Sequence, residues 1–127
     1  MKPKQRRSVE EILESTKEFL FPTWSPDKKV KLNSQDCMGD TPLHILASRG
    51  DAYGVRTLVD EGARLNVQGD MGLTPLHAAV SSGNTEVVTI LLEAGADPSI
   101  ASEFGTSAKE QALQSSKQLN SLFKRYT

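Results

Sequence analysis

Two histidines and one cysteine are the side chains of this 127-residue sequence that a metal ion or a nucleophilic reaction would most readily use. His44 and His77 lie 33 residues apart, each in a TPLH tetrapeptide, and imidazoles on facing elements could bind a transition metal. Cys37 stands alone, which excludes an internal disulfide and a multi-cysteine zinc site. The sequence has no phosphate-binding loop, no dinucleotide-binding glycine pattern and no nucleophile suggestively spaced from a base. We therefore expect no enzyme activity, no metal and no cofactor, with a two-histidine metal site as the alternative.

An internal repeat explains the spacing of the two histidines. GDTPLHILASRGD begins at Gly39, GLTPLHAAVSSGN begins at Gly72, and a diverged copy, GTSAKEQALQSSK, begins at Gly105. The stretches before them keep the same 33-residue spacing: VKLNSQ (30–35), ARLNVQ (63–68) and ADPSIA (96–101). So many positions in register predict stacked copies of one structural unit.

Each unit has the pattern of two helices joined by a glycine turn. A threonine can cap the first helix, proline suits its first position, and Gly50 or Gly83 suits the left-handed residue that ends it. The second helices are expected in YGVRTLVDEG (53–62) and TEVVTILLEAG (85–95), each ended by glycine. The apolar periodicity predicts that four leucines in particular are buried: Leu43, Leu58, Leu76 and Leu91.

A unit of this length that contains GxTPLH resembles the ankyrin repeat, and the resemblance covers roughly residues 30–125. It implies an all-α solenoid of stacked helix–turn–helix units. By resemblance, His44 and His77 hydrogen-bond to the turns between repeats. The resemblance also implies a protein–protein interaction module that binds through its turn tips and through the first helices, which line a concave face. Fold alone does not identify the partner.

Residues 1–29 do not follow the repeat and are expected to form an N-terminal arm, a capping helix and a linker. Ser8 to Leu20 reads as one helix with a capping box at Ser8 and Glu11 and an apolar face that would cover the first repeat. In the linker, Phe21 and Trp24 are expected to pack over the end of the stack. A ligand-binding Trp24 is the alternative.

Residues 30–127 are expected to hold about three repeats, of which the last is a C-terminal cap. An internal repeat exposes apolar surface on both sides, so a stack must be closed at its ends. Lys109 and Glu110 replace the leucine and histidine of TPLH, and the turn at 114–116 lacks glycine. The last helix would still offer three apolar residues to the stack: Leu119, Leu122 and Phe123.

Charge is unevenly distributed along the chain, although the net charge is −1. Residues 50–110 hold three basic residues against nine acidic ones, and such a field attracts a basic protein and repels nucleic acid. Ordinary solvated helix faces are the alternative. No apolar run approaches the ~20 residues of a membrane span. The basic start, MKPKQRR, is followed by acidic residues where a signal peptide would be apolar. We expect a cytoplasmic protein without a membrane partner.

Large apolar residues at the turn tips are the main candidates for partner binding. Met38, Met71 and Phe104 each precede the glycine of a tip and would align as an apolar ridge. The other candidates are the residue after the second glycine, the acidic residues beside the ridge and polar residues of the first helices: Leu73, Asp40, Asp70, Glu103, Arg49, Ser81 and Ser82. The alternative is that the apolar side chains fold back onto neighbouring turns as ordinary packing.

Three functions are compatible with these features. The first is a protein that is monomeric when free and that binds and neutralises one basic protein partner. A short chain with two capped ends and no effector domain fits this function. Small bacterial ankyrin proteins of this build resemble immunity proteins, and an acidic body would suit a nucleic-acid-cleaving toxin. The second is a eukaryotic regulatory adaptor in which KPKQRR (2–7) is a nuclear-entry signal. The third is an enzyme with an unrecognised site.

Overall fold

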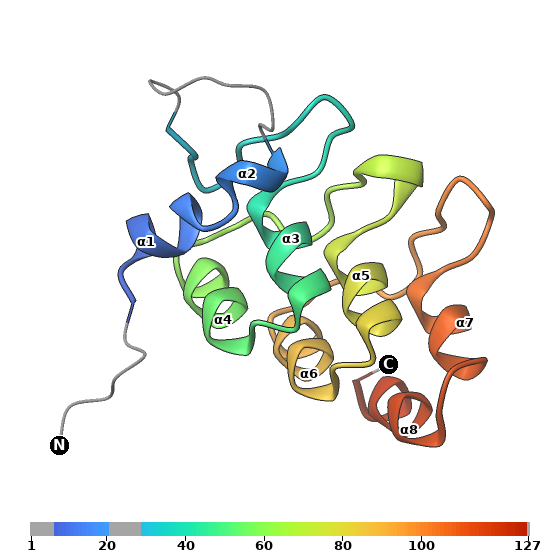
Figure 1. Ribbon diagram of the computed structural model, residues 1–127. Coiled ribbons are helices and arrows are strands. Elements are labelled where there is room, and N and C mark those ends of the chain that lie inside the picture. Colours follow the sequence, from blue (N-terminus) through green and yellow to red (C-terminus); the bar gives the residue numbers. More distant parts are fainter. Residues whose placement is uncertain (1–6, 21–28, 127) are drawn as a thin grey trace, which may run out of the picture.

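The computed structural model describes residues 7–20 and 29–126, a chain of short helices (Figure 1). The N-terminal elements are α1 (Val9–Glu14) and α2 (Lys17–Leu20). Three pairs follow, α3 (Pro42–Arg49) with α4 (Ala52–Asp60), α5 (Pro75–Ser82) with α6 (Thr85–Glu93), and α7 (Ala108–Leu113) with α8 (Lys117–Tyr126). A 3-10 turn, η1 (Asp70–Gly72), lies between the first two pairs. Within the described ranges, no helix is both long enough and apolar enough to cross a membrane.

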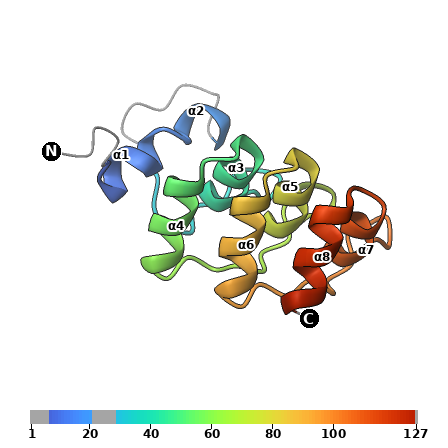
Figure 2. The ribbon, with the colours of Figure 1, turned by 90° about the horizontal axis from the view of Figure 1, so that it is seen from below.

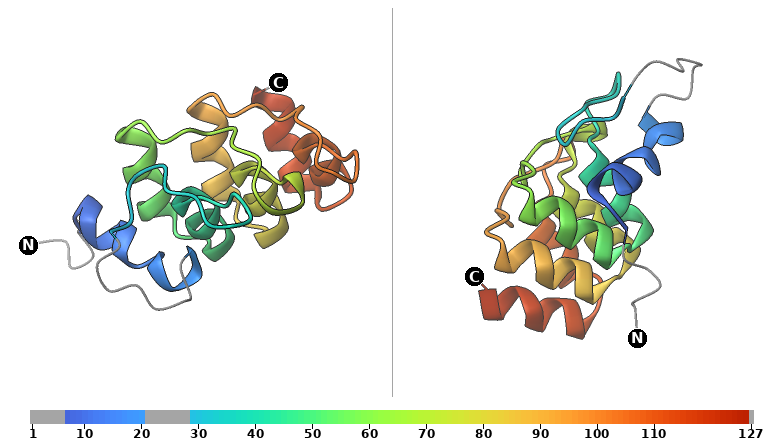
Figure 3. Two further views of the ribbon diagram at one scale, coloured as in Figure 1. Left: turned by 90° about the horizontal axis from the view of Figure 1, so that it is seen from above. Right: turned by 90° about the vertical axis from the view of Figure 1, so that its left-hand side faces the viewer.

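The three helix pairs stack in register, so that the first helices form one row and the second helices another. α3, α5 and α7 pack in the first row, and α4, α6 and α8 pack in the second (Figures 1 and 2). Figure 3 shows the helices of the second row side by side, with α1 and α2 lying across the start of the stack. The loop before each pair projects beyond the helices, and the three loops form neighbouring tips (Figure 1). This arrangement is the all-α solenoid that the repeat predicted.

The first helices begin and end where local chemistry predicts. The Thr41 and Thr74 hydroxyls accept hydrogen bonds from the backbone N–H of the TPLH histidines, and proline follows each threonine at the first helical position. Gly50 and Gly83 end α3 and α5 with φ of 74° and 71°, in the left-handed region that glycine adopts without a Cβ penalty. Asp51 caps α4 in turn by accepting from the Gly54 amide at 3.0 Å.

A continuous apolar core lies between the two rows and extends from α1 to α8. The four leucines predicted to be buried, Leu43, Leu58, Leu76 and Leu91, each expose 1% or less of their surface. Burial of one such side chain contributes roughly 1.5–3 kcal/mol of transfer free energy. Helices pack against their equivalents in neighbouring repeats as well as within each pair, so the core joins the repeats.

The N-terminal helix is broken, whereas the sequence predicted one helix from Ser8 to Leu20. The predicted capping box is present, but Ser15 and Thr16 separate α1 from α2. Each of these two hydroxyls donates at 2.6 Å to the carbonyl three residues earlier, and such bonds compete with the helical pattern. The bend lets both halves bury apolar residues, with Ile12 0% and Leu20 2% exposed.

Arg7 fastens the start of the described chain to the first repeat. Its Nη2 pairs with the Asp51 carboxylate at 2.8 Å, and its guanidinium lies 5.4 Å from the centroid of the Tyr53 ring. Burial raises the pKa of Asp51, but hydrogen bonds from Arg7 and the Gly54 amide, with the charges of Arg7 and Arg49, outweigh burial and hold the pKa below 3.8. Arg7 belongs to the basic segment of the adaptor hypothesis; residues 2–6 of that segment lie outside the described residues.

The last helix pair differs from the others at the residues the sequence singled out. Glu110 occupies the histidine position and completes a capping box, its Oε1 accepting from the Ser107 N–H at 3.2 Å. A carboxylate has no N–H with which to hold a following turn, so Glu110 serves the cap alone. Leu119 and Phe123 are 2% and 1% exposed, as expected, whereas Leu122 is only partly buried. The predicted packing of Phe21 and Trp24 lies outside the described residues.

Candidate functional site

The three tips are closed by the same backbone hydrogen bond at 33-residue intervals. The amide of Asp36 donates to the carbonyl of Asp40 at 3.0 Å, and that of Gly69 donates to the carbonyl of Leu73 at 2.8 Å. The third bond, from the Ser102 amide to the Thr106 carbonyl, is also 3.0 Å. The tips are therefore ordered loops that can hold side chains in register.

Each TPLH histidine connects its own helix to the next tip. His44 Nε2 donates to the Leu73 carbonyl at 2.8 Å, and His77 Nε2 donates to the Thr106 carbonyl at 2.9 Å. Their Nδ1 atoms accept from the backbone N–H of the capping threonines, both at 3.1 Å. A metal ion would have to displace one of these bonds, and the described residues contain no cluster of three potential ligands. The predicted role in holding the turns is confirmed.

Burial lowers the pKa of His44 from its ordinary value of 6.5. The hydrogen bond to the Leu73 carbonyl and the charge of Asp40 oppose this shift but do not outweigh it. The neutral ring is the form that fits, because its Nδ1 must accept from the Thr41 N–H.

A family model described as "Ankyrin repeats (3 copies)" matches residues 7–102 of the chain. The chain belongs to the ankyrin repeat family. The fold and the family were both predicted from the sequence. Ankyrin repeats are protein–protein interaction modules and are generally non-catalytic. A search of curated proteins found no match. Because the matched range crosses residue 29, the division of this ankyrin chain into 1–29 and 30–127 stays a prediction.

The apolar tip residues of the ankyrin stack are exposed, as the ridge hypothesis requires. Met38, Met71 and Phe104 expose 55%, 43% and 72% of their surface. Met71 has left-handed dihedrals, φ 58° and ψ 20°, and is followed by Gly72 at φ 71°. Two such residues in succession make the kind of turn that favours Asn-Gly over a methionine. The Met71 carbonyl also accepts from the Glu103 amide at 3.0 Å, which connects the second and third tips.

Asp40 holds the second tip from the first repeat. In the first tip, Asp36 Oδ1 accepts from the Met38 amide at 2.8 Å; the equivalent position of the second tip is Gly69, which has no side chain. Asp40 Oδ1 takes this place and accepts from the Asp70 amide at 3.0 Å. A Cβ at residue 69 would collide with that carboxylate. Asp40 was predicted as a partner-binding residue, and the structure gives it an internal bond as well.

Four of the predicted residues meet in one hollow between the first helices and the second tip. Asp40, Asp70, Met71 and Leu73 line a cavity of about 160 Å³. Its other lining residues come from α3 and α5: His44, Ile45, Ser48 and Ala78. A second cavity of about 150 Å³ shares two of these residues and extends to the N-terminal cap, with the lining Phe19, Ile45, Ser48 and Arg49. We call the two together the inner groove.

The sequence analysis missed part of the inner groove. Ile45 lies one position off the apolar row of α3 and is only partly buried, so an aliphatic residue at that position was a usable signal. Phe19 belongs to the apolar face predicted for the Ser8–Leu20 helix, but it is 56% exposed because the break at Ser15 and Thr16 turns α2. Ser48 and Ala78 gave no comparable signal.

The remaining predicted residues lie outside the first cavity, and several hold neighbouring elements together. Arg49 donates to the Ser15 carbonyl at 2.7 Å and stacks 4.8 Å from the centroid of the Phe19 ring. Ser82 Oγ donates to the Ala79 carbonyl of its own helix at 2.9 Å and to the Ala47 carbonyl of α3. Ser81 Oγ accepts from Gln111 Nε2 at 2.6 Å. Three further candidates are exposed at tips but do not line the groove: Met38, Glu103 and Phe104.

Proposed function

We propose that this ankyrin chain binds and neutralises one basic protein partner, with the inner groove as the centre of the interface. The observation that carries the proposal is the meeting of apolar and acidic groups in one hollow. Ile45, Met71 and Leu73 offer aliphatic surface next to the carboxylates of Asp40 and Asp70. A lysine or arginine side chain fits this chemistry, because its aliphatic stem can cover apolar groups while its charge pairs with a carboxylate.

The shape of the second tip supports a binding role for Met71. A non-glycine residue in the left-handed region is uncommon, and such outliers concentrate at functional sites. Methionine also adapts its shape to a partner better than most apolar residues. Met38 and Phe104 lie at the neighbouring tips and would extend the contact beyond the groove.

The partner we propose is a basic toxin, such as a nuclease, and the role is that of an immunity protein in the cytoplasm. The excess of acidic residues in 50–110 supports a basic partner over nucleic acid. The proposed action is binding by a monomer, with no cofactor, metal or membrane involved.

The test is affinity purification of the tagged chain from its native host, with three baits. Wild type and Leu113→Ala, which alters an exposed leucine outside the groove, are expected to retain the same basic protein. Met71→Ala combined with Leu73→Ala is expected to lose it, with binding weakened by about 2 kcal/mol or more. Wild type should also suppress the activity of the retained protein at stoichiometric amounts.

Two results would contradict the proposal. An acidic partner would remove the electrostatic argument. A double variant that binds normally but melts much earlier than wild type would place Met71 and Leu73 in the core rather than in the interface.

A further inference from the structure

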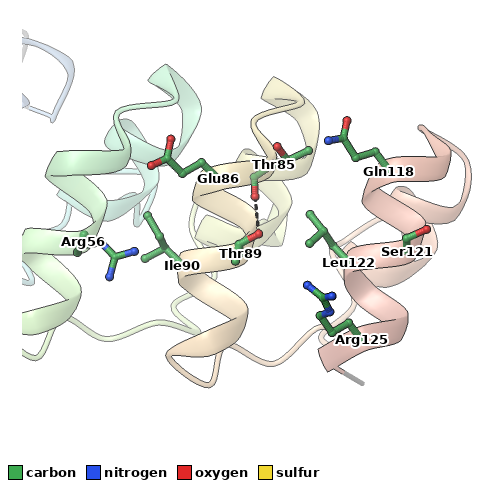
Figure 4. A pocket seen from close by; sticks show the side chains of 9 residues that line it. All are labelled: Arg56, Thr85, Glu86, Thr89, Ile90, Gln118, Ser121, Leu122 and Arg125. Carbon is green, nitrogen blue, oxygen red and sulfur yellow. Dashed lines mark hydrogen bonds between the residues drawn. The ribbon is translucent and has the colours of Figure 1, made fainter.

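A larger hollow lies on the opposite side of the molecule, across the row of second helices. It has a volume of about 550 Å³ and is lined from α4, α6 and α8 (Figure 4). The volume falls in the usual range for ligand sites, about 300–1,000 Å³. We call it the outer groove. It shares no residue with the inner groove.

The outer groove arises from side-chain size at one position of the repeat. Arg56, Thr89 and Leu122 are equivalent residues, 33 apart, and all three line it. The short Thr89 stands between two long side chains, and its hydroxyl donates to the Thr85 carbonyl of its own helix at 2.8 Å. The hollow over α6 is therefore open, and the Thr89 hydroxyl is already engaged.

The floor of the outer groove combines apolar side chains with threonine hydroxyls. Ile90 of α6 lies on the Arg56 side and is 5% exposed, Leu122 of α8 lies on the other side, and Thr89 stands between them (Figure 4). Leu122 is only partly buried, although Leu119 and Phe123 of the same helix lie in the core. Leu122 can therefore contact an aliphatic or aromatic side chain of another molecule.

The sides of the outer groove are basic, in contrast to the acidic character of residues 50–110. The exposed side chains of Arg56 and Arg125 lie on the two sides of the floor (Figure 4). Among the described residues that line the groove, Glu86 alone is acidic. Residues 111–127 add to this field, because they include Lys117, Lys124 and Arg125 and no acidic residue.

We propose that the outer groove docks an acidic peptide segment of a second protein, with an apolar side chain on Leu122 and carboxylates on Arg56 and Arg125. The planar guanidinium group pairs with a carboxylate through two parallel hydrogen bonds, which favours this partner chemistry. An inorganic anion would leave Leu122 uncovered. The two grooves then accept partners of opposite charge, so one chain can hold a basic and an acidic protein together.

The probe for the test is the synthetic peptide Ac-EDELFEEDE-NH2, added to the 15N-labelled full chain. Amide shifts are expected in α6 and α8 and around Arg56, and not at the tips. Two control peptides separate the contributions: Ac-EDESSEEDE-NH2 lacks the apolar pair, and Ac-KKKLFKKKK-NH2 reverses the charge. Both are expected to bind at least about tenfold more weakly, because the proposal needs apolar and charged contacts together.

Two double variants change the net charge by the same amount, one within the outer groove and one outside it. Arg56→Glu with Arg125→Glu is expected to weaken the probe about tenfold or more. Arg64→Glu with Lys109→Glu, two exposed basic residues outside the groove, is expected to change binding by less than about threefold. All four residues are exposed, and thermal melting of each variant checks that the fold is kept.

Several outcomes would overturn the proposal. One is the absence of amide shifts when the probe is added to about millimolar concentration, and another is shifts confined to the tips. The others are equal weakening of probe binding by both pairs of variants, and a serine peptide that binds as tightly as the probe. A second copy of the chain is the competing occupant, because α1 carries three glutamates. Sedimentation that shows self-association of wild type, abolished by Arg56→Glu with Arg125→Glu, would assign the groove to that second copy instead.

Discussion

At the scale of single residues, His44 joins a helix cap to the next repeat. Its ring is 5% exposed, accepts from the Thr41 N–H and donates to the Leu73 carbonyl. Protonation would place a second N–H where the ring must accept, so both the cap and the contact with the second tip depend on the neutral form. Leu73 borders the inner groove, which connects the state of His44 to the geometry of the candidate site.

The first prediction concerns the pH dependence of stability. The lowered pKa of His44 means that the unfolded chain binds a proton more readily than the folded one. The resulting stabilisation is complete above the unfolded value of about 6.5 and is lost as the pH falls through the lowered folded value. Urea unfolding from about pH 7 to about pH 5 should show a smaller pH dependence in His44→Gln, in which glutamine can still act in the capping box, than in wild type. Equal pH dependence in the two proteins would contradict this.

The second prediction concerns Met71, whose backbone is left-handed. This conformation costs a non-glycine residue roughly 1–2 kcal/mol. Met71→Gly should therefore raise the free energy of unfolding by about 1 kcal/mol, whereas Met71→Ala keeps the backbone cost. Chemical denaturation of both variants beside wild type provides the measurement. A glycine variant less stable than wild type would show that packing of the methionine side chain outweighs the backbone strain.

At the scale of elements, the helices are too short to be stable alone. The first helices have 8, 8 and 6 residues, and isolated helices of fewer than about 12–15 residues are marginal in water. Capping hydroxyls define their ends, but packing between neighbours holds them. α5 has neighbours on both sides, because it packs against α3, α6 and α7.

The third prediction follows from the central place of α5. Leu76 is 1% exposed, and Leu76→Ala should cost about 2–5 kcal/mol, the usual range for a core leucine. In a stack of this length, such a loss can unfold the whole chain. Leu113→Ala, at a side chain 52% exposed, is the control and should change the free energy of unfolding by less than about 0.5 kcal/mol. A Leu76→Ala protein that melts within a degree or two of wild type would show that the core assignment is wrong.

At the scale of the whole molecule, the two faces differ in chemistry. The tips and the inner groove combine apolar side chains with the carboxylates of Asp40 and Asp70. The row of second helices carries the larger groove, with Arg56 and Arg125 at its sides. The net charge of −1 does not show this local difference, because it also sums the basic residues of the N-terminal and C-terminal segments.

The fourth prediction tests whether the acidic residues near the tips speed the association of the proposed basic partner. Association should slow as salt is raised while dissociation changes less, because screening acts mainly on the diffusional encounter. Asp70→Asn with Glu103→Gln, both near the tips, should lower the association rate. Asp60→Asn with Glu61→Gln makes the same change in charge at the end of α4 and should have a smaller effect. Surface-plasmon-resonance rates that do not respond to salt would mean that the charge only keeps the protein soluble.

The sequence alone determined the repeat unit, the ends of the first helices, the buried leucines and the turn-holding role of the histidines. These features depend on chemistry within one repeat: a hydroxyl three residues from an amide, a glycine where φ must be positive, and apolar residues at helical spacing. The prediction of one helix from Ser8 to Leu20 was wrong at Ser15 and Thr16, where hydroxyl–backbone hydrogen bonds outweigh a continuous apolar pattern.

Only the tertiary structure decided which tip residues face a groove and which hold their neighbours. Asp40 reaches Asp70, and Arg49 reaches Ser15, across 30 and 34 residues of sequence. The outer groove likewise depends on Thr89 standing between Arg56 and Leu122 on three separate helices. Such contacts depend on how far each repeat is rotated and shifted against the next, and packing of whole elements sets that geometry rather than any local pattern.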